Sequence, residues 1–108
     1  MNFIAKRRAA LWVGKLERWA KQEVEQHQQA GPKGKSKLDH HGMYCLGVLD
    51  AIAIARGDRS PRAAMPKDRD QRQGLADANN LIRKVLTTGR IPGKNFIELL
   101  SDTDPVKK

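Results

Sequence analysis

Few side chains in the 108-residue sequence have types and spacings that suggest chemistry, and the most suggestive pair is His41 and Cys45. Residues four apart on a helix share a face, so this pair supplies half of the ligand set that a structural zinc ion requires. A complete site would need an unusual set such as His27, His41, Cys45 and a carboxylate, because the chain has one cysteine and three histidines. We therefore expect no metal site and no cofactor, and we interpret Cys45 as a buried thiol beside a histidine.

The same pair could act as a thiol nucleophile with a histidine base, but that chemistry needs an accessible thiol and an orienting third group. Cys45 instead lies inside an apolar stretch, residues 43–55, whose single charged residue is Asp50. An isolated carboxylate in such a stretch is costly unless it is paired, so we expect Asp50 to form a structural ion pair with Arg83 or Arg18. The sequence predicts that the protein is not an enzyme.

The stretch 43–55 is also the element around which the remaining chain must be arranged. It is too short to span a bilayer and too long for a typical strand, so it predicts a helix that is buried on nearly all sides. Ser36 can cap this helix, with Asp39 three residues later, and Gly57 suits its end. We therefore expect a central helix over about residues 37–56.

Three further helices are expected around this central one. Apolar residues recur at three- and four-residue steps over residues 2–29, which predicts one helix with a buried stripe. Trp12 and Trp19 lie on that stripe, and we expect them to be core residues in preference to platforms for base stacking. A third helix is predicted over residues 68–88, ending at Gly89, and a short fourth helix follows Asn95. Ser60 before a proline predicts one short extra turn.

The sequence shows no alternation typical of strands, so the predicted fold class is all-α. We expect a small irregular four-helix bundle that forms a single domain over residues 1–108, with a frayed tail at 102–108. The single cysteine excludes an intramolecular disulfide and favours a reducing, cytoplasmic location. No stretch is suited to a membrane, so we expect no membrane partner.

Charge is the strongest indication of function. The chain has 21 Lys and Arg against 12 Asp and Glu, a formal net charge of +9, which attracts nucleic acid or an acidic protein surface. Many of these cations fall in three connectors between the expected helices, which could lie at one end of the bundle; the sequence leaves open whether they form one surface. The predicted contact residues are Lys33, Lys35, Lys37, Arg59, Arg62, Lys67, Arg69, Arg83, Lys84, Arg90 and Lys94.

The stretch 81–93 ends an expected helix with Gly89, Arg90, Ile91 and Pro92. In this it resembles the passage from recognition helix to wing in excisionase-like winged-helix proteins. The resemblance covers a dozen residues, because a helical segment over 96–100 stands where the basic strand of a wing would follow. The resemblance marks one cluster that could meet phosphate groups together. Its members are Arg83, Lys84, Arg90 and Lys94.

Two functions of different classes agree with these observations. The first is a small basic accessory protein that binds nucleic acid without catalysis, as a regulator of the phage or prophage type, since small size and high charge without an active-site pattern are typical of such proteins. The alternative is a protein–protein interaction module that docks on a host enzyme, such as a DNA-processing enzyme, and inhibits or regulates it. A nucleic-acid binder should bind DNA or RNA by itself at low salt, whereas a docking protein should not. The oligomeric state stays open.

Overall fold

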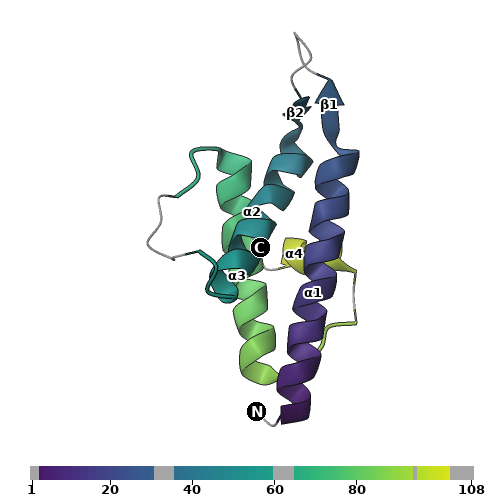
Figure 1. Ribbon diagram of the computed structural model, residues 1–108, viewed down its shortest axis with the longest axis vertical. Coiled ribbons are helices and arrows are strands. Elements are labelled where there is room, and N and C mark those ends of the chain that lie inside the picture. Colours follow the sequence, from purple (N-terminus) through teal and green to yellow (C-terminus); the bar gives the residue numbers. More distant parts are fainter. Residues whose placement is uncertain (1–2, 31–35, 60–64, 94, 103–108) are drawn as a thin grey trace.

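The computed structural model describes residues 3–30, 36–59, 65–93 and 95–102. Within these residues the chain forms helices α1 (Phe3–Gln26), α2 (His40–Ala55), α3 (Arg69–Thr88) and α4 (Phe96–Asp102), with two short strands, β1 (Gln28–Ala30) and β2 (Ser36–Leu38). The molecule is elongated, 52 × 28 × 25 Å, and α1, α2 and α3 run along its length while α4 lies beside the middle of α1 (Figure 1). The predicted all-α bundle is confirmed.

Helix α2 is the central element, as predicted. It packs against both α1 and α3, and all side chains over residues 41–54 are buried or half-buried. The α2–α3 contact is close because two glycines face backbone: Gly47 lies against the carbonyl of Gln71, and Gly74 lies against the carbonyl of Tyr44. A Cβ atom at either position would overlap the opposite backbone, so this helix crossing requires glycine on both sides.

The buried side chains form one core that draws on all four helices. Its members are Ala9, Trp12, Val13, Leu16, Ala20, Cys45, Val48, Ala51, Ile52, Leu75, Ala78, Leu81, Ile82, Val85 and Leu100. Helix α4 is fixed to α1 through Phe96, whose ring centroid lies 5.8 Å from that of Trp12 and 5.6 Å from that of Trp19. The predicted core role of both tryptophans is confirmed.

The ends of α3 and α4 follow the sequence signals. Asp68 caps α3, since its Oδ1 accepts the N–H of Gln71 at 3.0 Å, and Gly89 ends the helix with a left-handed φ of 70°. Asn95 caps α4 by accepting the N–H of Glu98 at 2.9 Å. The predicted boundaries of these two helices are confirmed.

The predicted start of the central helix near Lys37 is wrong, because residues 36–38 form strand β2. This strand pairs antiparallel with β1, and Gln28 lies opposite Leu38. Each strand has three residues, which is too short for an alternating pattern to be visible in the sequence. The same ribbon ends α1 at Gln26, three residues before the predicted end.

Asp39, and not Ser36, caps α2. Its Oδ1 accepts the backbone N–H of Gly42 at 2.8 Å, so the carboxylate that the sequence suggested as the partner in a capping box is itself the cap. The predicted turn after Ser60 and the tail from residue 103 lie outside the described residues. Among the described helices, none is both long enough and apolar enough to cross a lipid bilayer.

Candidate functional sites

Asp50 has structural partners, but they are not the predicted ones. Its Oδ1 lies 2.7 Å from Nη1 of Arg59, and its Oδ2 accepts a hydrogen bond from Nε2 of Gln71 at 2.8 Å. The predicted partners Arg83 and Arg18 are wrong because Asp50 faces the first half of α3 and the residues that follow α2. Arg59, a predicted contact residue, is therefore held in an ion pair.

The described members of the predicted contact set lie at both ends of α3. Lys33, Lys35, Arg62 and Lys94 lie outside the described residues, as does the side chain of Lys37. Lys67 and Arg69 lie at the start of α3 and Arg83 and Lys84 lie near its end, about 20 Å further along the helix at 1.5 Å per residue. The β1–β2 ribbon and the residues after α3 also lie at opposite ends of the molecule (Figure 1). Because parts of all three connectors lie outside the described residues, whether they share one surface stays open.

The structure instead separates charge along the long axis. Residues 3–16 and 78–93 contain no acidic residue, and Figure 1 shows the start of α1 beside the end of α3. We call the cations of these two segments the basic end; they are Lys6, Arg7, Arg8, Lys15, Arg83, Lys84 and Arg90. All seven side chains are exposed. None of them forms an ion pair with an acid in the part of the chain that the structure describes.

Charge is balanced over the rest of the described chain. Residues 17–30, 36–59 and 65–77 hold at least as many acids as lysines and arginines, and several of these cations are paired. Arg56, for example, lies 2.7 Å from Glu17. The surplus positive charge of the described chain therefore lies at the basic end. Sequence reasoning missed its α1 half, although the acid-free run over residues 3–16 is the signal that locates it.

Large apolar side chains are also exposed on the same part of α1. Phe3, Ile4 and Leu11 are 76%, 63% and 62% exposed, and Arg7 and Arg8 lie between them in the sequence. A helix face that mixes exposed apolar and basic side chains is typical of a surface that contacts a partner.

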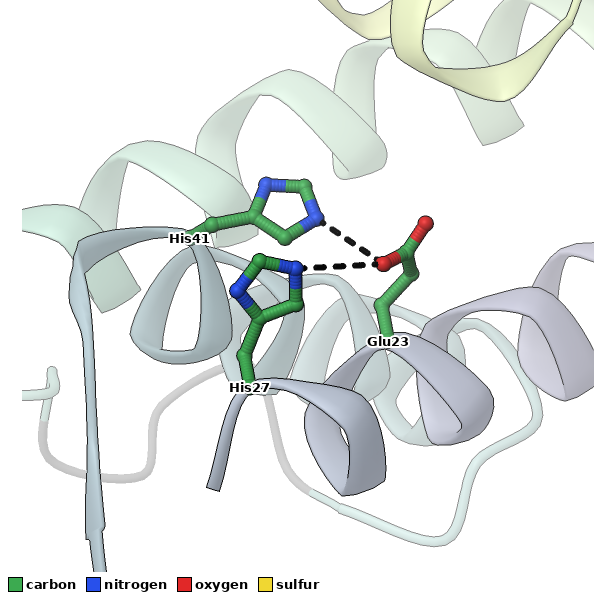
Figure 2. A group of neighbouring side chains, drawn as sticks. All are labelled: Glu23, His27 and His41. Atoms are coloured by element: carbon green, nitrogen blue, oxygen red, sulfur yellow. Dashed lines mark ion pairs between the residues drawn. The ribbon is translucent and has the colours of Figure 1, made fainter. Parts of the chain in front are cut away.

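A different cluster lies at the opposite end of α1, beside the β1–β2 ribbon. Glu23 lies in the last turn of α1, His27 directly follows α1, and His41 lies in the first turn of α2. Figure 2 shows the three side chains pointing toward one another. Oε2 of Glu23 lies 3.5 Å from Nε2 of His27 and 3.4 Å from Nε2 of His41. The potential metal-ligating atoms of these three residues all lie within 4.8 Å of one another.

Asp39 contacts His27 on the side of the ring that faces away from Glu23. Its Oδ2 lies 2.8 Å from Nδ1 of His27 while its Oδ1 caps α2. The hydrogen bond with His27, together with the one from Gly42, lowers the pKa of the Asp39 carboxyl. Asp39 therefore stays ionised and accepts a hydrogen bond from Nδ1 of His27, while Nε2 of His27 faces Glu23.

Cys45 lies next to the cluster and is fully buried. Its Sγ is 3.6 Å from Nε2 of His41, and burial raises the pKa of the thiol to about 12. The thiol is therefore protonated at neutral pH and is a poor nucleophile. The interpretation of Cys45 as a buried thiol is confirmed.

Comparisons of the chain with protein-family models, with curated proteins and with solved structures find no match. Function must therefore be inferred from sites. The molecule offers two: the basic end, and the cluster of Glu23, His27 and His41.

Proposed function

We propose that the protein is a non-catalytic accessory protein that binds nucleic acid through its basic end. The observation that carries this proposal is the separation of charge: the first half of α1 and the end of α3 hold seven exposed cations and no acid, and none of the seven is in an ion pair within the described residues. A duplex or single strand that neutralises such cations releases condensed counterions, which drives binding independently of sequence. The cations predicted near the start of α3 alternate with acids and contribute less.

The composition of the basic end favours contacts to phosphate over contacts to bases. Phosphate contacts fix the position of a protein on nucleic acid but carry no sequence information. The large aromatic side chain exposed at this end of the described chain is Phe3, whereas both tryptophans are committed to the core. We therefore expect weak sequence preference, with dissociation constants on the order of 10⁻⁴–10⁻⁶ M at physiological salt.

The test is fluorescence anisotropy with labelled single- and double-stranded DNA and RNA over a salt series. If all seven cations contact phosphates of duplex DNA, the slope of log association constant against log salt concentration can be no steeper than about −6. The variant R7Q/R8Q/R83Q/K84Q should bind at least about 100-fold more weakly at low salt, and its slope should be shallower by up to about 3.6.

The matched control removes four cations outside the basic end, in the variant K21Q/K67Q/R69Q/R72Q. It has the same net charge, and all four side chains are exposed, so a much smaller loss of affinity would locate the contact at the basic end. Equal losses in the two variants would show that only total charge matters. Absence of binding at low salt would overturn the proposal.

Docking on an acidic protein is the second candidate, and the exposed Phe3, Ile4 and Leu11 favour it. Apolar side chains add nothing to phosphate contacts but strengthen protein–protein contacts, in which such anchors supply much of the affinity. The variant F3S/L11S separates the two functions. It should leave nucleic-acid affinity within about twofold under the counterion-release mechanism, and it should weaken binding to a protein partner strongly if docking is the function.

A further inference from the structure

We propose that Glu23, His27 and His41 form a binding site for a divalent transition-metal ion, of which Zn²⁺ is the best-suited example. The sequence provides too few cysteines and histidines for a common zinc motif, and for that reason no metal site was expected. The fold changes this assessment, because it brings two of the three histidines and a glutamate from separate helices to one point (Figure 2).

The distances fit shared coordination better than hydrogen bonding. The two imidazole Nε2 atoms lie 3.4 and 3.5 Å from the same carboxylate oxygen, beyond the 2.7–3.2 Å that is usual for an N–H···O hydrogen bond. In a tetrahedral zinc site with bonds of about 2.0–2.2 Å, neighbouring nitrogen and oxygen ligands lie about 3.3–3.5 Å apart. Each histidine nitrogen therefore already lies at ligand spacing from the Glu23 oxygen, and all three ligand atoms lie within 4.8 Å of one another.

Asp39 supplies the support that metal-binding histidines usually have. A ligating histidine commonly donates its other ring N–H to a carboxylate, which fixes its tautomer and raises its basicity as a ligand. Nδ1 of His27 makes this contact with Oδ2 of Asp39 at 2.8 Å. Because Asp39 is also held by the N-terminus of α2, the orientation of His27 is set by the fold before any ion arrives.

Burial and ligand chemistry indicate the class of ion. The three side chains are 17–34% exposed, so an ion can enter from solvent and yet be partly shielded from it. Two imidazoles and one carboxylate suit Zn²⁺ and neighbouring transition metals, whereas Mg²⁺ and Ca²⁺ prefer oxygen ligands throughout. Three protein ligands leave the fourth position to water, because the thiol of Cys45 lies outside the group of three.

A bound ion would tie two helices together at the ribbon. Glu23 and His27 lie at the end of α1 and just after it, and His41 lies in the first turn of α2. Coordination would therefore link the end of α1 to the start of α2. Ligands brought together only by folding bind metal only in the folded state, and the free energy of binding then adds to the free energy of unfolding. We therefore expect Zn²⁺ to raise the melting temperature of the protein.

The experiment uses untagged, chelator-treated full-length protein, titrated with ZnCl₂ by isothermal titration calorimetry and melted with and without Zn²⁺. One ion per chain should bind, and E23Q and H41Q should each lower the affinity at least about 100-fold, since even loss of a supporting group costs 10–100-fold. Circular dichroism confirms that each variant is folded. The two substitutions lie in different helices, so if one variant fails to fold, the Zn²⁺ affinity of the other still tests the proposal.

The matched control is H40Q, because His40 is adjacent in sequence but its side chain is 96% exposed and bonds to Asp70 at 2.6 Å. This variant should bind Zn²⁺ like the wild type and show the same rise in melting temperature. C45S should also retain binding. The proposal is overturned if the wild type shows no saturable binding, if H40Q and H41Q lose affinity equally, or if C45S alone abolishes it.

Discussion

The two ends of α1 carry charged side chains in opposite arrangements. At the basic end the cations of α1 and α3 are exposed, without acids in either segment and without ion pairs in the described structure. At the ribbon end the charged and polar groups face one another, as Glu23 does with His27 and His41. One helix therefore exposes unbalanced charge at one end and turns its charged groups toward neighbouring elements at the other.

The boundary between the two arrangements is Glu17. It is the first acid of the chain, and it lies 2.7 Å from Arg56, just after α2. Before Glu17 the helix turns only apolar and small residues toward its neighbours; after it, acids and histidines take part in contacts between helices. If the two ends are independent, a change at one end should leave binding at the other end unchanged.

The largest effect on the free energy of unfolding is expected at the close crossing of α2 and α3, in the core between the two ends. Replacing Gly47 by alanine would force a Cβ atom into the backbone carbonyl of Gln71, which backbone shifts must relieve. We expect a loss of at least about 3 kcal/mol in the free energy of unfolding, the upper range for an overpacked core. Urea unfolding followed by circular dichroism measures it.

Gly93 gives the matched control for this change. A Cβ atom there would meet nothing within 4 Å, so G93A should leave the free energy of unfolding within about 0.5 kcal/mol. Because α2 packs against both α1 and α3 in one core, a G47A protein that loses this packing should lose binding at both ends. A stable G47A protein would show that the helices do not cross as closely as described.

The second prediction is that the two sites are independent when the core is intact. R7Q/R8Q/R83Q/K84Q should lose about 100-fold in nucleic-acid affinity and keep its rise in melting temperature with Zn²⁺. E23Q should do the reverse, because Glu23 follows Arg7 by 16 residues, about 24 Å along α1 at 1.5 Å per residue. Anisotropy and thermal melts on the same two proteins provide the comparison. Loss of nucleic-acid binding in E23Q would contradict the assignment of separate roles.

The sequence predicts the helices well and their mutual contacts poorly. The helical periods, the Asn95 cap and the stop at Gly89 are local signals, and the structure follows them. The partner of Asp50 is Arg59 and not Arg83, since pairing depends on which face of α2 meets α3, which spacing along one helix does not determine. The β1–β2 ribbon was missed because three-residue strands leave no pattern.

The same distinction explains what sequence reasoning found of the two sites. An acid-free run is visible along the chain, so the α1 half of the basic end could have been recognised, and its α3 half was. The cluster at the ribbon could not, because Glu23 and His41 are 18 positions apart and meet only when α1 and α2 pack. A list of candidate ligands contained His27 and His41, but their proximity is a property of the fold.

A smaller effect is expected from Asp39, which supports the cluster without being one of its proposed ligands. In D39N the helix cap is retained, since asparagine caps as well as aspartate, while the charge that orients His27 is removed. We expect Zn²⁺ affinity to fall about 10-fold, the lower range for loss of a supporting carboxylate. Calorimetry measures the affinity, and unchanged melting of the metal-free protein checks the cap. Wild-type affinity in D39N would mean that Asp39 serves only α2.

The smallest effect is expected at the boundary residue Glu17. The hydrogen bond from Arg56 lowers the pKa of its carboxyl below the ordinary value of 4.5. A carboxyl with a lowered pKa stabilises the fold above its unfolded-state pKa, and this contribution is lost as the pH falls from about 4.5 through the folded-state value. E17Q should therefore be less stable than the wild type by about 0.5 kcal/mol at pH 7, typical of a surface ion pair.

The difference between E17Q and the wild type should vanish when both are unfolded in urea at a pH well below 4.5, because the wild-type Glu17 is then protonated and residue 17 is neutral in both proteins. A difference that persists at low pH would show that Glu17 acts through packing and not through its charge. Binding at the two ends provides the second measurement. Because Glu17 belongs to neither site, E17Q should keep both the rise in melting temperature with Zn²⁺ and the binding of nucleic acid. That result would place Glu17 between two independent ends.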